Sequence, residues 1–268
     1  MAYFVYLAVM GLFQPLPVTH RLALLACPVA LCALWLLEAS ASTRGSRVTR
    51  EWLSLSLILA GYWSLGWFPA APREQWQIAW AGWDRVLLDG LGLRQAVEAF
   101  GALVPTILES VYFLVYAIPV VSLGVLYHGG QSARARPYLL VLFLGTFAAY
   151  SLLPLFPVRS PRVVFPETGG PSFHGIPRSI NTWLLDRLDT APSVFPSGHV
   201  AVAFSSAFGL LTVLRERRGI WMGAFLAASL VYIATVYGRY HYAVDGLASI
   251  GITLVAWRIS NWWSPDGN

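Results

Sequence analysis

The sequence contains no lysine, only two cysteines and few charged residues of either sign. Only 12% of its 268 residues are charged, whereas soluble domains average about 25%. The two cysteines, Cys27 and Cys32, lie within one apolar stretch and indicate neither a disulfide framework nor a thiolate metal site. The net charge of +5 rests on arginines scattered between apolar stretches, a pattern that does not indicate nucleic-acid binding. The composition therefore excludes an ordinary soluble domain.

What the chain has in abundance is hydrophobic sequence, 57% of all residues, in continuous runs. A transmembrane barrel would instead alternate apolar and polar residues over segments of about ten. The runs predict an all-α, polytopic membrane helix bundle with about seven transmembrane helices. The expected spans cover residues 21–39, 52–68, 103–127, 137–156, 197–214, 219–237 and 241–258.

Two further segments predict helices that do not cross the bilayer. Residues 1–13 are apolar but too short to span about 30 Å, so we expect an interfacial or re-entrant helix there. Trp76, Trp80 and Trp83 recur at helical spacing in the loop 69–102. This pattern favours an amphipathic helix with tryptophan at the level of the lipid headgroups.

The arginines predict the orientation of the bundle. Three short turns, 40–50, 128–136 and 215–218, hold eight arginines against one glutamate. Alternation of the spans puts all three turns on one side, and short arginine-rich turns face the cytoplasm. The loops 69–102 and 157–195 then face outward, and we expect the functional residues described next on that extracytoplasmic side.

The stretch Pro196-Ser197-Gly198-His199 opens one apolar span. Ser197 is a favourable N-cap, and Gly198 allows a ligand to approach the backbone closely. Free N–H groups and the positive end of the helix dipole suit a phosphate, beside which His199 would stand. A capped helix with an interfacial histidine is an equally good interpretation of this short motif alone.

His241 and Asp245 open another span, four residues apart and therefore on one helix face. The aspartate can accept the hydrogen on Nδ1 of the histidine, which leaves Nε2 free as a nucleophile. The alternative is that this pair is half of a metal site, but the sequence offers no clear third and fourth ligand. His128 and His174 are expected to be plain surface residues. We expect no metal and no cofactor.

Pro-Ser-Gly-His followed by Arg-Tyr-His-Tyr-Ala-Val-Asp-Gly resembles the second and third motifs of the type 2 phosphatidic acid phosphatase superfamily. The resemblance covers roughly residues 52–258. It implies a six-helix catalytic domain in residues 52–268, with residues 1–51 adding an extra span and a basic turn. It also implies that His241 attacks phosphorus, that Asp245 orients it and that His199 is the general acid.

The chain departs from the phosphatase branch of that superfamily at the first motif, which requires a lysine. In its place stand Arg159-Ser160-Pro161-Arg162, which resemble the inositol phosphorylceramide synthase-like branch. Trp83-Asp84-Arg85 and the pair Glu109 and Tyr112 also resemble that branch. The residues expected to bind the substrate phosphate are Arg162, Arg159, Arg239, Ser197 and Gly198.

These features predict an integral-membrane phosphoryl-transfer enzyme that acts on a lipid phosphate or phospholipid headgroup through a phosphohistidine. Water as acceptor makes it a lipid phosphatase, and an alcohol acceptor makes it a headgroup transferase. Its expected place is the bacterial plasma membrane, where other lipids surround it. A non-enzymatic transporter or scaffold with a vestigial site is the alternative, and it predicts paired charges deep within several spans, where Glu109 is the main candidate. Nothing in the sequence indicates an oligomeric state.

Overall fold

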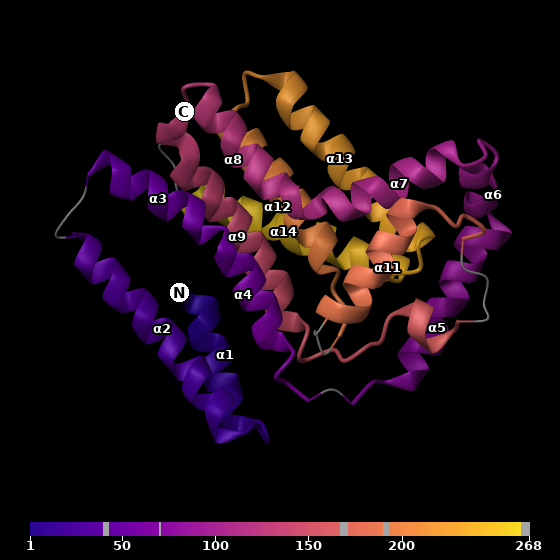
Figure 1. Cartoon of the computed structure of the whole chain (residues 1–268), viewed down its shortest axis with the longest axis horizontal. Helices are drawn as coiled ribbons and strands as arrows, with labels where there is room; N and C mark the ends of the chain where they lie inside the picture. Colours follow the sequence, from indigo (N-terminus) through magenta and orange to yellow (C-terminus); the bar gives the residue numbers. More distant parts are fainter. Residues whose placement is uncertain (40–42, 70, 167–170, 190–192, 264–268) are drawn as a thin grey trace.

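The computed structural model describes residues 1–263 except 40–42, 70, 167–170 and 190–192. The described residues form helices and turns without a strand, which confirms the all-α prediction. Figure 1 shows the helices in order: α1 (Ala2–Phe13), α2 (Val18–Ala39), α3 (Arg44–Ser54), α4 (Ser56–Leu65), α5 (Glu74–Arg85), the π-helical turn η1 (Val86–Gly90), α6 (Leu93–Glu98), α7 (Leu103–Leu114), the 3-10 turn η2 (Val115–Ala117), α8 (Ile118–His128), the 3-10 turn η3 (Ser132–Arg134), α9 (Ala135–Leu152), α10 (Pro161–Val164), α11 (Ile176–Leu188), α12 (Gly198–Val213), α13 (Arg218–Tyr237) and α14 (Ala243–Trp263).

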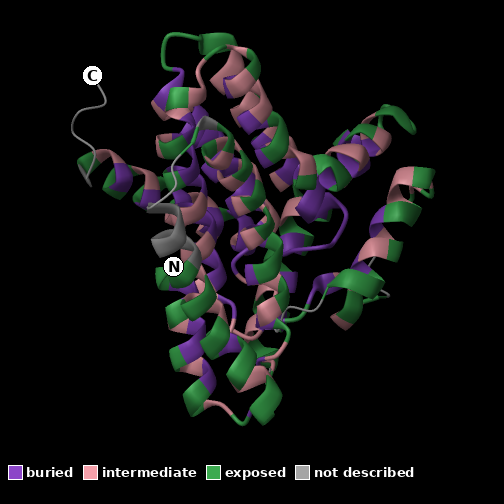
Figure 2. Ribbon diagram, turned by 60° about the vertical axis from the view of Figure 1, so that its left-hand side comes forward, coloured by how far each residue is buried: buried purple, intermediate pink, exposed green. Residues whose placement is uncertain are grey.

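Helix α12 is the centre of the bundle, and α9, α13 and α14 pack around it. Most of its residues are buried, and Figure 2 shows the buried residues concentrated along the central helices. Small residues permit the close approach that drives helix association inside a membrane. A Cβ added at Gly209 of α12 would lie 2.8 Å from Cδ2 of Tyr138 in α9. A Cβ added at Gly145 of α9 would lie 3.3 Å from Cβ of Ser205 in α12.

Four of the described helical segments are long and apolar enough to cross a membrane, fewer than the seven predicted spans. These four are Leu103–His128, Ser132–Leu152, Arg218–Tyr237 and Ala243–Trp262. Gly198–Val213 and Val18–Ala33 are apolar but shorter. The predicted span 52–68 is divided, because α3 ends at Ser54 and α4 begins at Ser56. Hydropathy located the apolar runs, but it does not show where a helix breaks.

The two predicted non-spanning helices are present as α1 and α5. Helix α1 packs against α2 and α9, and its tyrosine hydroxyls bond to main-chain oxygens of the bundle. Tyr3 donates to Gly61 O at 2.9 Å and Tyr6 donates to Ser151 O at 2.6 Å. Helix α5 carries the predicted tryptophans and packs against α14, the last span.

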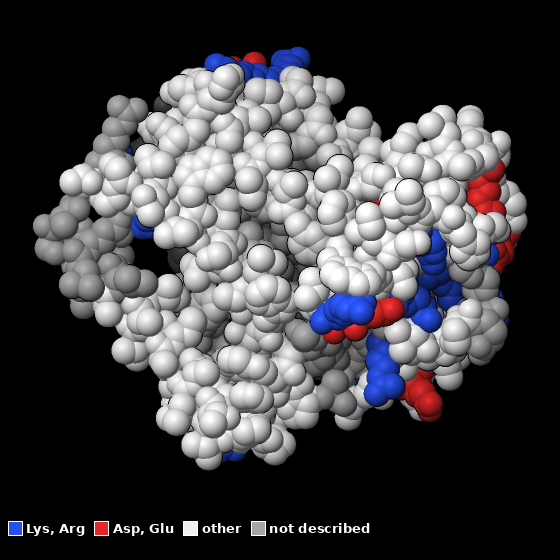
Figure 3. All heavy atoms as spheres, in the orientation of Figure 1, with Lys and Arg blue, Asp and Glu red and all other residues white. Residues whose placement is uncertain are grey.

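The three arginine-rich turns lie together at one end of the bundle. Tyr127 at the end of α8 donates to Glu51 of α3 at 2.6 Å. Arg134 pairs with Glu216 at 2.6 Å across the other two turns. On the face shown in Figure 3, most charged atoms gather at the top and along the right side, and much of the surface between them carries no charge. Large hydrophobic side chains are exposed on the outer faces of α8, α13 and α14, as expected for surfaces that contact lipid.

The close packing of α9 on α12 makes a first prediction. Gly209→Ala should destabilise the fold by about 1–3 kcal/mol, because the new methyl group meets the ring of Tyr138, which is completely buried and cannot swing aside. Gly223→Ala in α13 is the matched control, because a Cβ there meets no atom within 4 Å. Thermal unfolding in detergent should therefore show a lower midpoint for the first variant only. Equal midpoints would contradict this account of the α9–α12 contact.

Candidate active site

The first wall of the site is the N-terminal end of α12. Ser197 caps the helix, and its hydroxyl accepts the N–H of Val200 at 3.4 Å. Gly198 lies against Tyr150, and a Cβ there would be 2.9 Å from Cε1 of that ring. A residue with a side chain at position 198 would therefore push α12 away from α9. This contact holds the helix end, and His199 in its first turn, in place.

The ring of His199 is fixed by two tyrosines of the α7–α8 segment. It stacks on Tyr112 with ring centroids 4.7 Å apart. Its Nε2 shares a hydrogen bond of 3.1 Å with the hydroxyl of Tyr116. The ring also meets His241 edge-on, at 5.8 Å between centroids. The two motif histidines, 42 positions apart in the sequence, thus face each other.

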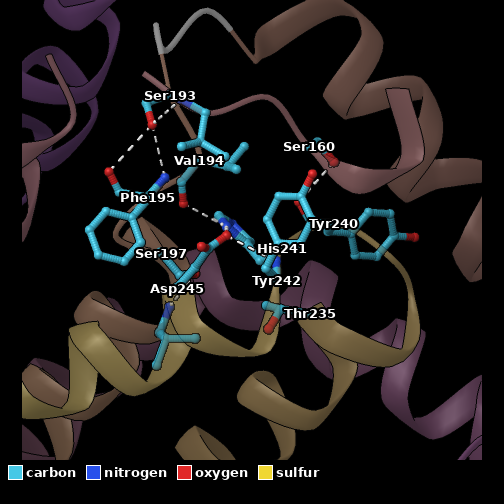
Figure 4. A network of polar contacts seen from close by, with 12 residues as sticks. Ser160, Ser193, Val194, Phe195, Ser197, Thr235, Tyr240, His241, Tyr242 and Asp245 are labelled. Atoms are coloured by element: carbon cyan, nitrogen blue, oxygen red, sulfur yellow. Dashed lines mark hydrogen bonds and ion pairs between the residues drawn. The ribbon is translucent and has the colours of Figure 1, made fainter. Parts of the chain in front are cut away.

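His241 lies in the loop between α13 and α14, and Figure 4 shows how its ring is held. Nδ1 lies 2.9 Å from the carbonyl oxygen of Val194 and 3.3 Å from Oδ2 of Asp245. Both partners are acceptors, so Nδ1 carries the hydrogen and Nε2 keeps its lone pair. Asp245 is completely buried and also accepts the N–H of Tyr242 at 2.9 Å.

The loop that carries His241 is tied down by its own main-chain groups. The N–H groups of Tyr240 and His241 both donate to Thr235 O. The carbonyl of Arg239 accepts the N–H of Arg162 at 3.1 Å. The hydroxyl of Ser160 donates toward the carbonyls of Arg239 and Tyr240, at 3.2 and 2.9 Å. The segment Arg159-Ser160-Pro161-Arg162 therefore holds the loop in place through hydrogen bonds and also supplies positive charge.

Asp84 of α5 provides a further tie, and it reaches across 159 positions of sequence. Its Oδ1 accepts the N–H of Ala243, two residues after His241, at 3.0 Å. The side chain is 1% exposed. Burial raises the pKa of Asp84 from 3.8 to about 6, and the negative charge of Asp245 adds to this rise. The hydrogen bond from Ala243 and the positive charge of Arg239 act in the opposite direction.

A narrow cavity lies between the histidines. The polar groups that line it include His199, His241, Arg162, Ser160, Tyr112 and Asp189. Arg162 pairs with Asp186 of α11 at 2.8 Å, and both side chains remain partly exposed. An exposed pair of this kind contributes little to stability, so an incoming anion can replace the aspartate. Arg162 is thus the predicted phosphate ligand that the structure brings to the histidines.

The other predicted phosphate ligands lie in different places. Gly198 lines the cavity, whereas Ser197 is completely buried and serves α12 as its cap. Arg159 is outside the cavity lining, and its N–H donates to Oε1 of Gln77 at 2.7 Å. Arg239 is 3% exposed, has a positive φ of 64°, and lies in the electrostatic field of Asp84 rather than in the cavity lining.

A second buried network anchors α11 over the site. Glu109 of α7 is 1% exposed and pairs with Arg178 of α11 at 2.7 Å. Asn181 and Tyr240 donate to Oε2 of the same carboxylate, at 2.7 and 2.6 Å. Burial, reinforced by the charge of Glu109, raises the pKa of Tyr240, so that its hydroxyl remains a donor. This Glu109 network joins α7, α11 and the His241 loop.

Sequence reasoning missed several of these contacts. The carbonyl of Val194 acts through the main chain, so no residue type could have indicated it. Asp84 belongs to a tripeptide that the sequence did single out, but its partner is a distant main-chain N–H. Tyr116 lies one helical turn after Tyr112 on the same face, and that spacing was the one available signal.

Comparison with known proteins agrees with this geometry. The sequence profile described as the PAP2 superfamily matches residues 81–259, which is two thirds of the chain. The chain belongs to the PAP2 superfamily. This matched region includes both histidines, Asp245, Asp84 and Arg162, whereas α1 to α4 precede it. Membership of the PAP2 superfamily supports a phosphatase-type function in a membrane protein.

One relative of known name is the PA-phosphatase related-family protein of Dictyostelium discoideum. It is 32% identical over 132 residues, which are 45% of this chain and 22% of that protein. The chain thus matches less than a quarter of the length of its relative. No solved structure matches the chain.

The second prediction concerns Asp84. Asp84→Leu leaves the buried N–H of Ala243 without an acceptor and should cost about 1–3 kcal/mol of stability, whereas Asp84→Asn retains an acceptor oxygen and should cost less. Because the pKa is raised to about 6, the stabilisation by the Asp84 proton is complete below about pH 4 and is lost as pH rises through 6.

Asparagine does not titrate and supplies the control. Relative to Asp84→Asn, the wild-type unfolding temperature in detergent should fall between about pH 4 and about pH 7, the window that follows from the raised pKa. A constant difference in unfolding temperature across this range would show that Asp84 does not titrate as described. Equal effects of the leucine and asparagine variants would show that Asp84 does not hold the loop.

Proposed function

We propose that the protein is a membrane-embedded phosphoryl-transfer enzyme that acts on a lipid phosphate or phospholipid headgroup through a phosphohistidine. The observation that carries this proposal is the pair of facing histidine rings, one of which has its Nδ1 held by two acceptors. An imidazole held in this tautomer presents an unprotonated Nε2, which is the requirement for a nucleophile. The second ring is then in place to act as the acid.

In the proposed reaction, Nε2 of His241 attacks phosphorus and forms the N–P bond. The P–O bond to the alcohol breaks, and His199 donates its proton to the departing oxygen. Asp245 and the carbonyl of Val194 stabilise the charge that develops on the His241 ring, because both accept from Nδ1. In the second step an acceptor attacks phosphorus, and its proton passes to His199. The N–P bond then breaks and both histidines return to their starting state.

The phosphate charge is met by Arg162 and by the free N–H groups at the start of α12. Arg162 exchanges the carboxylate of Asp186 for a phosphate oxygen when substrate binds. Arg159 and Arg239 lie outside the cavity lining, so their proposed contribution is to the field around the site and to the loop that carries His241. The mechanism requires neither a metal ion nor a cofactor.

The acceptor is water in a lipid phosphatase and an alcohol in an inositol phosphorylceramide synthase-like transferase. The motif Arg159-Ser160-Pro161-Arg162 and the absence of lysine favour the second branch. The direct test is purified protein in detergent with a panel of lipid phosphates and phospholipids. Free phosphate in the products indicates the phosphatase, and a new phospholipid indicates the transferase.

A transporter or scaffold with a vestigial site is the competing proposal, and it predicts paired charges inside several spans. The long segment Leu103–His128 carries the buried carboxylate of Glu109 in its first third, and the partners of this carboxylate come from α11 and the His241 loop. The Glu109 network therefore supports the site itself. This position favours the enzyme over the transporter.

The third prediction concerns the proposed catalytic triad, His241, His199 and Asp245. His241→Ala should lower kcat by about 10⁴-fold or more, since the nucleophile is lost. His199→Ala should lower it by about 10²–10⁴-fold, the range for a general acid. Asp245→Asn should retain a trace of activity, because the carbonyl of Val194 still accepts the hydrogen on Nδ1. A well-folded His241→Ala protein with near wild-type turnover would rule out the phosphohistidine.

We further propose that the site faces the extracytoplasmic side of a bacterial plasma membrane. Helix α12 carries His199 in its first turn and ends at Val213, next to the basic turn 215–218, which Arg134 joins through Glu216. These arginine-rich turns thus lie at the opposite end of the bundle from His199, and such turns face the cytoplasm. Substrate then comes from the outer leaflet.

The fourth prediction tests this side. Single cysteines are placed at Ser172 and at Gly130, in a background without Cys27 and Cys32. A membrane-impermeant thiol reagent applied to intact cells should label position 172, which lies on the side of the site, and should spare position 130 in a basic turn. The opposite labelling pattern would place the site in the cytoplasm and move its substrates to the inner leaflet. Permeabilised cells, in which both positions should react, provide the control for reactivity.

A further inference from the structure

A second cavity, of about 490 Å³, opens beside His199 on the side away from Arg162. It lies between α4, the α7–α8 segment and α11. Apolar side chains make up most of its lining, among them Leu59, Phe113, Val120, Leu184 and Leu188. Its volume is typical of a site that encloses a small ligand or part of a lipid.

The apolar cavity and the phosphate cavity meet at one place. Tyr62, Gly198 and His199 line both of them, whereas Arg162 and His241 line only the phosphate cavity. His199 therefore stands at the boundary between a polar and an apolar compartment. Leu59, Phe113 and Val120 are each 40–45% exposed, so the apolar compartment also opens to the outer surface of the bundle.

Tyr116 marks this boundary from the apolar side. It lines the apolar cavity, and its hydroxyl lies 3.1 Å from Nε2 of His199. The position of Tyr116 depends on a local break in the span. Pro119 has no N–H to donate to the carbonyl of Val115. The N–H of Ile118 bonds to that carbonyl instead, which forms the 3-10 turn η2. Nε2 of His199, the atom that donates the proton, thus points toward the apolar cavity.

We infer that the apolar cavity binds the hydrocarbon chains of the alcohol that leaves phosphorus, and that Tyr116 is a positioning residue for the oxygen of that alcohol. This inference rests on the proposed function and adds the orientation of the substrate. Phosphate lies between His241 and Arg162, the ester oxygen lies between phosphorus and Nε2 of His199, and the chains extend past Tyr116. The substrate class is then a lipid whose phosphate ester joins directly to the alcohol that bears the chains.

This orientation determines which bonds form and break and where the proton goes. Nε2 of His241 bonds to phosphorus, the ester P–O bond breaks, and the proton of His199 passes to the lipid alcohol, which departs through the apolar cavity. In a transferase, the acceptor enters by the same route when it is also a lipid alcohol. It gives its proton to His199 and takes the phosphoryl group from His241.

The first test fills the cavity. Val120→Trp places an indole in it, and Val121→Trp places the same group on the outside of α8, where Val121 is 61% exposed. Each protein is assayed with dioleoyl and with dihexanoyl phosphatidic acid. We expect Val120→Trp to lower the ratio of kcat/KM for the long-chain to the short-chain substrate by about tenfold, the effect of about two methylene groups left unburied. Val121→Trp should keep the wild-type ratio. Equal ratios in the two variants would overturn the inference.

The second test separates positioning by Tyr116 from a merely structural role. An alkyl alkoxide needs a proton as it leaves, whereas p-nitrophenolate leaves without one. Tyr116→Phe should therefore lower kcat for an alkyl phosphate about tenfold more than kcat for p-nitrophenyl phosphate. Equal losses on both substrates would indicate a structural role and contradict the assignment.

A binding experiment distinguishes failure of this inference from failure of the proposed function. A phosphatidic acid with a photoreactive diazirine at the chain end is bound to the His241→Ala protein, which does not need to turn over. Peptide mapping should find the label in 55–63, 113–120 or 184–188, and excess phosphatidic acid should suppress it. Label confined to other segments would overturn the cavity assignment. Specific label here, combined with a wild-type protein that transfers no phosphate, would overturn the proposed reaction alone.

Discussion

The position of one nitrogen atom, Nδ1 of His241, determines how the rest of the site is arranged. Two acceptors from different parts of the chain hold it, Asp245 on the helix that follows and the carbonyl of Val194 in the loop before α12. Each acceptor is itself held, since Asp245 accepts the N–H of Tyr242 and Val194 donates its N–H to the carbonyl of Val158. The carbonyl of Asp245 also accepts the N–H of Ser197 at the start of α12. The histidine loop and the start of α12 are therefore one hydrogen-bonded unit, which couples the positions of the two histidine motifs.

The physical reason for so many ties is the cost of burying polar groups. The site lies in an apolar bundle, where an unpaired main-chain N–H costs about 1–3 kcal/mol. The loop between α13 and α14 meets this requirement with a donor hydroxyl from Ser160 and with acceptor oxygens from Asp84 and Thr235. Asp84 belongs to α5 and Ser160 caps α10, so these two short helices support the candidate site. Their contribution is rigidity, and the triad receives its geometry from them.

Sequence patterns singled out the two histidines and the aspartate that the structure brings together, but not the contacts that hold them, for a definable reason. His199, His241 and Asp245 are identified by residue type at fixed spacing, because the chemistry needs those side chains. Val194 contributes only a main-chain oxygen, and Asp84 is joined to Ala243 across most of the chain, so local spacing carries no information about either. The spans show the same limit. Hydropathy identified the apolar run 52–68, but it carries no information about the break that separates α3 from α4.

The two cavities that meet at His199 divide the chemistry by polarity. A phosphate ester of a lipid has one end that needs cations and donors and another that is stable only away from water. The chain places Arg162 and His241 at the first end and a leucine- and phenylalanine-lined space at the second. In the proposed reaction, the one group that must contact both ends is His199, the acid that protonates the ester oxygen. Its side chain lines both cavities, and the 3-10 turn before Pro119 brings a tyrosine hydroxyl to its donating nitrogen. A break in an apolar helix, which costs stability where it occurs, thus lies where the proposed reaction would use it.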